Sequence, residues 1–478
     1  MRLQTLSISA ATVALILAGC GGHSSSNKNK TIAPVTTAPV NTNNPPPPPP
    51  PTTTLTVSAP VGSLAAARIG PDAVAMALEV AVTGGGSARL TGMTLTAAGT
   101  IDESTGLGAL KIVGDDNRNG LVDAGERVMA NVAAPAFATD NGTVAVTFTQ
   151  SITIASGASI RVIVAVDASA TGATAVAKIG KTVELQIAAA GDVTATAASQ
   201  PITPAGSFPV SGGITTLFLH DHLLITEVAP RPTFPTCGEF VEIFNPTGQT
   251  VDLSNYYLTD ATNNTNPVTN YQNVATGAGF AVPLTSDWLV RFPAGATIAP
   301  GQVVVVAIDA VQFSTAYPGK TANYAIRTAG PQTPFMRIFT AGAWTQATAG
   351  TGVGLTDAGE PVILFTWDGQ SDLVKDVDYM FYGTPSATNA NVEKTGISVD
   401  GPDAGTNPST FLVETPAFQQ STRSAPPAAS DTVNALQRID FVEGSEAKTG
   451  GNGITGNDET SEVWNTTFIN GAATPGVP

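Results

Sequence analysis

The chain is poor in charged residues and in histidine. Charged residues make up 12% of its 478 positions, about half the share found in ordinary soluble proteins. Only 3 residues are His, which leaves few general bases with an unperturbed pKa near neutrality. The 21 basic residues are outnumbered by 37 acidic ones, for a net charge of −16. Nucleic-acid backbones are bound by clustered Lys and Arg, so this composition argues against a nucleic-acid partner.

Motifs of known catalytic centres are also missing from the sequence. It shows no nucleotide-binding loop, no Ser-His-Asp arrangement, no zinc motif and no basic patch with aromatics. Thr, Ala, Gly and Pro are abundant instead, which favours a secreted, β-rich protein. We therefore expect a protein without enzymatic activity that is long enough for two or three domains.

The first 20 residues, MRLQTLSISAATVALILAGC, have the pattern of a secretory signal. Arg2 precedes an apolar run that is shorter than a membrane-spanning helix needs. The ending Leu-Ala-Gly-Cys resembles the lipobox of bacterial lipoproteins, in which the signal is cut before a cysteine that carries the lipid. The resemblance implies a signal peptide over residues 1–19 and lipidation of Cys20. The chain would then be anchored in the bacterial cell envelope, at the outer membrane or the cell surface; an ordinary secretory signal is the alternative.

Residues 20–54 predict a disordered linker. They include the run NTNNPPPPPPPTTT, which lacks the apolar content to fold. Its seven consecutive prolines span about 22 Å in the polyproline form, at ~3.1 Å per residue. Beyond Cys20 the only other cysteine is Cys237, so we expect no disulfide within the mature chain and a packed rather than reactive thiol.

Residues 55–216 read as short strands separated by turn signals. Val144, Val146 and Phe148 alternate with small or polar residues, and this period of two indicates half-buried strands. Seven such segments predict an immunoglobulin-like β-sandwich, with a barrel as the competing architecture. The Asn-Gly pair at 141 and 142 is a hairpin signal. No helix longer than a turn or two is expected here. The seven segments are LTVSA, ALEVAV, RLTGMTLTA, ALKIVG, TVAVTFT, SIRVIVAVDA and TVELQIA.

The stretch DDNRNGLVDAGE, residues 115–126, resembles an EF-type calcium loop. Alternate residues of such a loop supply oxygen ligands, a glycine at its sixth position permits a sharp turn, and a glutamate at its end closes the coordination sphere. Gly120 occupies the sixth position. The alternative is a solvated Asn/Gly-rich turn. The predicted Ca²⁺ ligands are Asp115, Asn117, Asn119, the carbonyl of Leu121, Asp123 and Glu126.

Strand-like sequence precedes this loop, and only a brief amphipathic stretch follows it. A calcium sensor needs paired helices that reorient, so the loop predicts a structural staple of the β region rather than a switch. Only three of the predicted ligands are charged, which favours a weak affinity of about 10⁻⁴ to 10⁻³ M, as in extracellular modules.

Residues 217–478 contain a second series of strand motifs. LLITEV is followed by GEFVEIFNPTGQTVDLSNYYLTD, IAPGQVVVVAID and GLTDAGEPVILFTWDG. The order of these motifs resembles the lamin tail domain, over residues 222–478. The resemblance implies a second immunoglobulin-like β-sandwich. The residues agree with it, because Val241 and Ile243 should face one side of a strand and Phe240, Glu242 and Phe244 the other.

Three segments, 261–297, 310–353 and 384–434, are long insertions relative to that family. Loops of this length are either functional or partly disordered. Asp400, Asp403, Asp458 and Glu459 lie in Asp/Asn/Gly-rich stretches, where a second cation site and solvated turns are both open.

Other polar and aromatic residues could form a site. His220-Asp221-His222 places two imidazoles on one face of a strand, but a third metal ligand is not identifiable, so polar residues at a domain junction are favoured. The motif acids Glu227, Glu239 and Glu242 are interpreted as strand and turn hydrogen-bond acceptors. Aromatics that could stack on a glycan are few and favour a core role: Trp344, Trp367 and the pair Tyr256-Tyr257.

Together these features predict a noncatalytic, lipid-anchored envelope protein with two β-sandwich regions. Its expected partners are the membrane, through the lipid, and an envelope protein or glycan. The alternative is a metal-dependent extracellular hydrolase of phosphoesters or glycans, whose site the insertions would form with Glu242 or His222.

Overall fold

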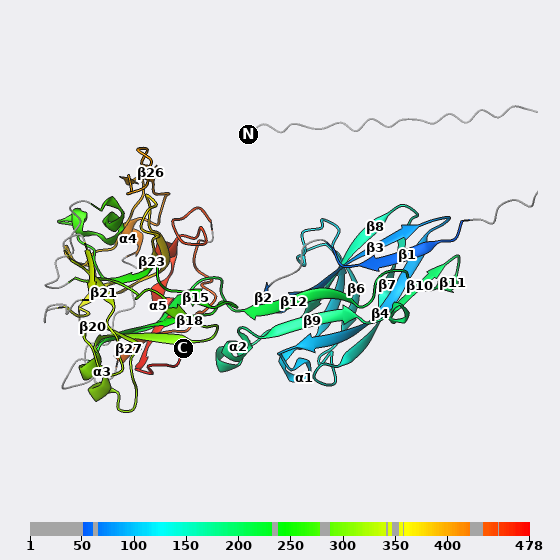
Figure 1. Cartoon of the computed structure of the whole chain (residues 1–478), viewed down its shortest axis with the longest axis horizontal. Helices are drawn as coiled ribbons and strands as arrows, with labels where there is room; N and C mark the ends of the chain where they lie inside the picture. The colour runs from blue at the N-terminus through cyan, green and yellow to red at the C-terminus, as the bar shows by residue number, and fades with distance from the viewer. Residues whose placement is uncertain are drawn as a thin grey trace, which may run out of the picture. The chain divides into compact units, whose positions relative to one another are not determined.

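The structure, a computed structural model, is built mainly from β-strands with short helices (Figure 1). This confirms the all-β class. The residues it describes are 51–60, 66–231, 238–277, 287–340, 343–346, 353–356, 358–420, 434–447 and 449–478. Cys20, Cys237, the signal and most of the proline-rich linker lie outside these ranges. Within them, no helix is long and apolar enough to span a bilayer.

The first twelve strands form two sheets. In order across the sheet, the five-stranded one contains β1 (Thr54–Ser58), β3 (Ala73–Thr83), β8 (Ser159–Val166), β5 (Leu110–Gly114) and β6 (Arg127–Val132). The seven-stranded one contains β11 (Gln200–Ile202), β10 (Val193–Ala197), β4 (Ala88–Gly99), β9 (Thr182–Ile187), β12 (Val210–Phe218) and β2 (Ala66–Arg68), with β7 (Thr143–Ile154) paired to β4. The helical turns are α1 (Glu103–Gly106), α2 (Gly172–Lys178) and η1 (Ala190–Asp192).

Alternation along the strands explains the sandwich. On β7, Val144, Val146 and Phe148 are buried while their neighbours are exposed, as the period of two predicts. They pack into one core with residues of both sheets. All seven predicted strands are present. The hairpin predicted at Asn141 and Gly142 is wrong, because β6 and β7, on either side of this turn, belong to different sheets.

The strands from β13 onward form two six-stranded sheets and two small ribbons. One sheet runs β20 (Tyr324–Thr328), β19 (Val303–Asp309), β14 (Phe240–Phe244), β13 (Leu224–Arg231), β27 (Asn434–Arg438) and β28 (Phe468–Ala472). The other runs β22 (Ala343–Gln346), β21 (Arg337–Thr340), β17 (Leu289–Arg291), β16 (Tyr256–Thr259), β23 (Gly359–Thr366) and β24 (Lys375–Gly383). The ribbons are β15 (Val251–Asp252) with β18 (Thr297–Ile298), and β25 (Ser398–Val399) with β26 (Ser409–Thr410).

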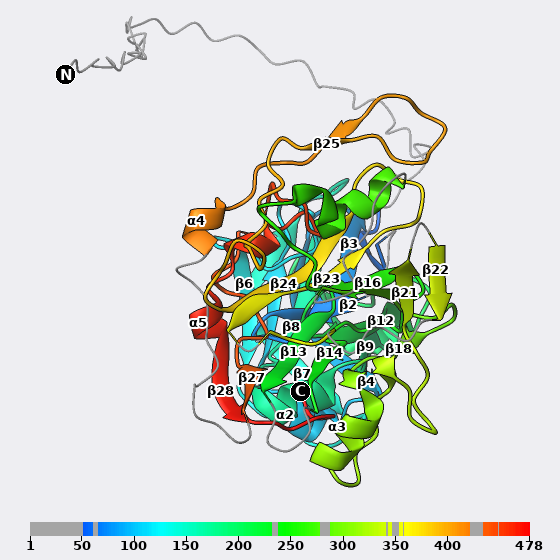
Figure 2. The same cartoon turned by 90° about the vertical axis from the view of Figure 1, so that its left-hand side faces the viewer.

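Short helical segments connect these strands. They are η2 (Pro267–Thr269), η3 (Tyr271–Thr276), α3 (Ala310–Ala316), α4 (Ala417–Gln420), η5 (Glu459–Ser461) and α5 (Trp464–Thr467). In Figure 2, the loop that carries β25 projects beyond the large sheets.

Strand β14 shows how the two sheets meet. Val241 and Ile243 lie in the core shared by the two six-stranded sheets. Phe240 faces the opposite side, where its ring packs edge-on against Phe313 of α3 with centroids 5.6 Å apart. This is the predicted sidedness. Strand β19 is buried along nearly its whole length, so it reads as a continuous apolar run rather than an alternating one.

The predicted insertions are largely part of the sheets. Residues 261–297 supply β17, and residues 310–353 supply β20, β21 and β22. These strands pair with core strands at the sheet edges. The third insertion, 384–434, carries β25, β26 and α4.

A buried ion pair ties this third insertion to β24. The Nζ of Lys394 lies 2.6 Å from Asp376 of β24 and 2.7 Å from Glu414. It also donates a hydrogen bond of 2.8 Å to the hydroxyl of Tyr271. Burial opposes its charge, but the two carboxylates raise the pKa of Lys394 above its usual range. The lysine is therefore charged and fully paired inside the protein.

We expect Lys394→Met to destabilise the protein by about 3–5 kcal/mol, because removing one partner of a buried ion pair leaves the other charges uncompensated. Chemical unfolding followed by tryptophan fluorescence measures this. Lys375→Met is the control, since Lys375 is an exposed lysine on β24, and surface changes cost at most about 0.5 kcal/mol. An equal loss of unfolding free energy in the two variants would contradict a stabilising role for the buried ion pair of Lys394.

Candidate functional site

The predicted calcium loop is the connection of a β-hairpin. It joins β5 to β6, whose last and first residues, Gly114 and Arg127, are paired. The loop therefore has a strand on each side, and the brief amphipathic stretch expected after it is β6. Asp115, its first residue, is almost fully buried at 1% exposure. A loop fixed between two paired strands has no helix to move.

Hydrogen bonds inside the loop bring the predicted ligands together. The carboxylate of Asp115 accepts the backbone N–H groups of Asn119 and Gly120, each at 3.0 Å. Gly120 has a φ of 78°, which a glycine adopts without strain. The side-chain amides of Asn117 and Asn119 both donate to Asp123 at 2.7 Å. The backbone N–H of Asp123 donates to Glu126 at 3.0 Å.

The donor set fits a calcium ion. Carboxylate, amide and carbonyl oxygens are the ligands that Ca²⁺ takes. The Oε1 atom of Glu126 is buried and accepts no hydrogen bond in the structure, as expected of an oxygen reserved for a cation. The carbonyl of Leu121 belongs to the same turn, while its side chain is exposed. Among the described residues, the three loop carboxylates do not form a compact acidic group by themselves, so amide and carbonyl oxygens have to complete the set.

The second cation site considered in the Asp/Asn/Gly-rich stretches does not assemble as predicted. Asp400 and Asp403 are exposed. Asp458 is buried and accepts hydrogen bonds from Thr415. In the described part of the chain, no group of metal-ligating side chains joins these aspartates to Glu459.

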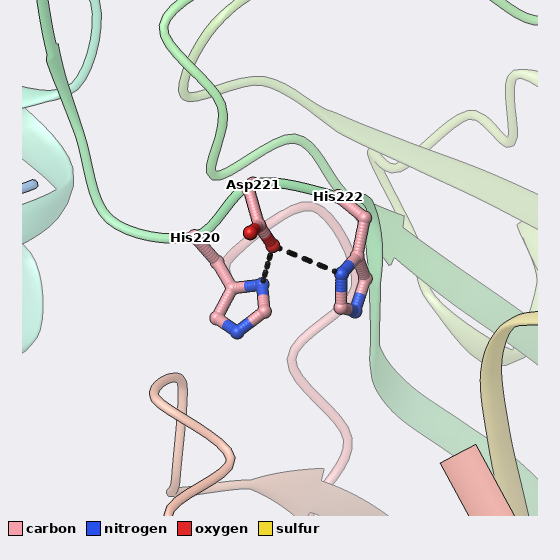
Figure 3. Close-up of side chains that lie close together, drawn as sticks. All are labelled: His220, Asp221 and His222. Carbon is pink, nitrogen blue, oxygen red and sulfur yellow. Dashed lines mark hydrogen bonds and ion pairs between the residues drawn. The ribbon is translucent and has the colours of Figure 1, made fainter. Parts of the chain in front are cut away.

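The two histidines lie in the turn between β12 and β13, not on a strand as predicted. Figure 3 shows Asp221 between the two rings, and its Oδ1 is 3.1 Å from Nδ1 of His220 and 3.2 Å from Nδ1 of His222. The rings meet edge to face with centroids 4.3 Å apart. Both imidazoles are buried, at 1% and 4% exposure.

A distant glutamate faces the other side of both rings. Oε2 of Glu443 lies 3.2 Å from Nε2 of His220 and 3.3 Å from Nε2 of His222. The second oxygen of Glu443 is 3.3 Å from the guanidinium of Arg438, at the end of β27. Arg438 also binds Asp378 at 2.6 Å and Glu462 at 3.0 Å.

We call the three carboxylates that contact this arginine, together with two buried glutamates that interact with them, the acidic cluster. All of its members are less than 9% exposed. Sequence reasoning did not find the partners of the histidines, because they lie more than a hundred residues away along the chain. The acidic cluster consists of Asp378, Glu443, Glu446, Glu459 and Glu462.

Burial and mutual repulsion perturb these groups strongly. Burial opposes charge on His222, but hydrogen bonds to Asp221 and Glu443 raise its pKa to about 9. Burial lowers the pKa of His220. Burial, together with neighbouring carboxylates, raises the pKa of Glu459 well above its usual range. These shifts favour a neutral Glu459 and a charged His222, so the cluster contains more carboxyl groups than Arg438 alone can pair.

The lamin-tail motif acids have the hydrogen-bonding role predicted for them. Glu227 and Glu242 are paired on the adjacent strands β13 and β14. Glu227 accepts the backbone N–H of Thr474 at 2.8 Å, and Glu242 accepts that of Gly476 at 2.6 Å. Glu239 accepts the backbone N–H of Leu355 at 3.3 Å.

The aromatic residues considered for glycan stacking mostly belong to the core. Tyr257 is fully buried and stacks on Phe365 with centroids 4.9 Å apart. Trp367 is 8% exposed and donates its indole N–H to a backbone carbonyl at 2.7 Å. Trp344 lies 5.2 Å from the Tyr257 ring, and Tyr256 packs against the same core. They fill the sandwich rather than forming an open platform.

The buried motif acids predict a pH dependence of stability. Burial raises the pKa of Glu227 to about 7 and that of Glu242 to about 8. The folded state then keeps protons that the unfolded chain releases, so stability falls as pH rises from about 4.5 to about 8. We expect Glu242→Gln to remove part of this loss. Relative to wild type, the variant should gain a few kcal/mol between pH 5 and 8.5, at about 1.4 kcal/mol per pKa unit.

Thermal unfolding across this pH range measures the gain. Glu393→Gln removes the same charge from an exposed position. The stability of this variant should therefore change with pH in the same way as that of wild type. A Glu242→Gln curve that also stays parallel to wild type would show that Glu242 is ionised in the folded protein.

Of the comparisons with known proteins, the scan against family models supports the resemblance seen in the sequence. No curated protein matches the chain. Among solved structures, a DUF4876 family protein from Bacteroides thetaiotaomicron matches at 14% identity with a TM-score of 0.28, covering 78% of this chain and 90% of that one. The major pilin subunit of Bacillus cereus matches at 12% identity with a TM-score of 0.12, covering 54% of this chain and 59% of that one. The family model for the lamin tail domain matches residues 220–380, so this part of the chain is similar to a lamin tail domain.

Proposed function

We propose that the chain is a noncatalytic lipoprotein of the bacterial cell envelope, anchored through Cys20. It presents a calcium-stapled β-sandwich and a lamin tail domain for binding or for organising the envelope. The observation that carries the noncatalytic role is the use of the lamin-tail motif acids. Glu227 and Glu242, a carboxylate pair on adjacent strands, accept backbone N–H groups of the C-terminal segment.

The cavity beside α3 supports the same reading. Its volume is about 310 Å³, enough for a small ligand. Small and uncharged residues line it, among them Ala310, Ser314 and Thr333. No acid, base or nucleophile pair of the kind that a hydrolase uses lines this cavity.

The alternative of a metal-dependent hydrolase gains no support from the insertions. Two of them add strands to the sheets, and the third is tied down by the buried Lys394. Glu242 is engaged with the backbone. We therefore propose binding or structural roles, with the membrane as one partner and an envelope protein or glycan as the other.

The calcium staple is proposed on the geometry of the hairpin between β5 and β6. Ca²⁺ would be held by Asp115, Asn117, Asn119, Asp123 and Glu126 together with the Leu121 carbonyl, and would neutralise the three carboxylates. An ion at this point fixes the position of the hairpin end relative to the sheet. Extracellular calcium is in the millimolar range that suffices for the expected affinity of about 10⁻⁴ to 10⁻³ M.

The anchor is tested by Cys20→Ser in the full chain, expressed in a Gram-negative host. Wild type should label with radioactive palmitate and partition into the detergent phase, because acyl chains supply membrane affinity. The variant should do neither. Equal labelling of the two proteins would contradict lipidation at Cys20.

The staple is tested by melting the protein in millimolar calcium and in the calcium-selective chelator EGTA. We expect chelation to lower the free energy of unfolding by about 1–2 kcal/mol, as mass action gives for a weak site near saturation. Glu126→Gln should abolish the difference.

Asp116→Asn serves as the matched control for this measurement. It removes a charge from an exposed loop position that is not a predicted ligand. It should therefore retain the calcium effect. Identical melting of wild type in calcium and in EGTA would contradict the staple.

A further inference from the structure

The interior of the lamin-tail-like part brings together a histidine and two glutamates whose ligating atoms lie close to one another. We propose that His222, Glu443 and Glu459 bind a divalent transition metal, with Zn²⁺ as the ion that their chemistry favours. One ligating atom from each residue lies within 4.8 Å of the others, and all three side chains are buried. With bonds of about 2.0–2.2 Å in a tetrahedral shell, two ligand atoms of one zinc ion lie about 3.3–3.6 Å apart. Small side-chain movements therefore bring the three atoms onto one ion.

The orientation of the imidazoles is that of metal ligands. Metal-binding histidines commonly donate their other ring N–H to a carboxylate, which fixes the tautomer. Asp221 occupies this place for both rings, facing Nδ1 of His220 and of His222. The Nε2 atoms consequently point to the buried side, where Oε2 of Glu443 lies 3.2 Å from that of His220 and 3.3 Å from that of His222. Asp221 is thus a positioning residue for the imidazole of His222.

Glu443 is held in place by its backbone and by Arg438. Its φ is 52°, in the left-handed region that non-glycine residues seldom adopt and that often marks functional sites. Arg438 contacts Oε1 at 3.3 Å, while Oε2 faces the two histidines. Oε1 of Glu443 therefore contacts the arginine, and Oε2, the oxygen nearest the histidines, is directed to the proposed metal site.

The charge balance of the acidic cluster also calls for a cation. Three carboxylates contact Arg438, and Glu459 interacts with the carboxylates of this group rather than with the arginine. Oε1 of Glu459 has no hydrogen-bond partner although the residue is only 3% exposed. Buried carboxylates need a cation or a proton. A divalent ion among His222, Glu443 and Glu459 satisfies all three. The competing arrangement, a protonated histidine beside a neutral glutamic acid, is the outcome that the test has to separate.

The ligand types select the class of ion. Imidazole suits zinc, copper, iron and nickel, whereas Ca²⁺ prefers an all-oxygen shell. The site is closed by burial, as structural zinc sites are. It would link the turn before β13 with two segments far along the chain, the loop after β27 and η5. The ion would thus hold the first residues of the lamin-tail-like part to residues that lie beyond the match to the lamin tail family model.

The test uses the full-length chain, purified in detergent without a histidine tag and stripped of metal. Titration with Zn²⁺ alone, followed by calorimetry, should show one site per chain, and Co²⁺ should give the visible absorption bands of a bound ion. Glu459→Gln and His222→Ala should each weaken zinc binding by at least about 100-fold, because even outer partners of metal ligands are worth about 10–100-fold.

Two further variants keep the test decisive. Asp221→Asn changes a half-exposed residue, so it should fold, and it should weaken zinc binding by about 10–100-fold. Glu126→Gln in the calcium loop should leave zinc binding unchanged, which separates this site from the proposed calcium staple. Absence of a zinc site, or zinc binding that survives both Glu459→Gln and Asp221→Asn, overturns the proposal and leaves an internal ion-pair network.

Discussion

The pairing of β27 with β13 is the constraint on which the second half of the chain depends. These strands are far apart in sequence, yet Glu227 pairs with Gln437 in the middle of the six-stranded sheet. Without β27 and β28, strand β13 would present an open edge, which is prone to unwanted pairing. The buried Glu227 and Glu242 also hold the segment after β28 against the sheet, because they accept its backbone N–H groups. The match to the lamin tail domain ends at residue 380, so the sheet is completed by residues beyond it.

Charged residues are few in this chain, and the buried ones lie where long connecting segments are held against the sheets. Lys394 holds two carboxylates and a tyrosine hydroxyl, and Arg438 holds three carboxylates. Buried ions are costly unless they are paired and hydrogen-bonded. Each buried ion-pair network is therefore complete only when the segments that it joins are in their native positions. The same reasoning links Arg438 at the end of β27 and Asp378 within β24 with the histidine turn, where the buried carboxyl groups outnumber the arginine.

The sequence predicted the parts of the structure that follow local rules. Strand patterns predicted β7 and the six other strands expected in residues 55–216, and the sidedness of Val241 and Ile243. The sequence also placed the loop at residues 115–126 between two strands. Short strands such as β2 and β11 escaped, since three residues are too few for a period to show. The partners of His220 and His222 also escaped, because Glu443 and Glu459 lie in a Gly- and Asn-rich stretch with the composition of a solvated turn. Only long-range strand pairing buries them.

The central claim is that the buried polar groups of this chain, with the ions they bind, hold β-sheets together and perform no chemistry. A crystal structure of the full chain grown with calcium and zinc, with anomalous scattering measured at the zinc edge, tests it most directly. The account predicts oxygen-ligated calcium in the loop at residues 115–126 and a zinc peak enclosed by His222, Glu443 and Glu459. A metal in a solvent-open cleft, with a free coordination position beside residues of the insertions, would contradict it.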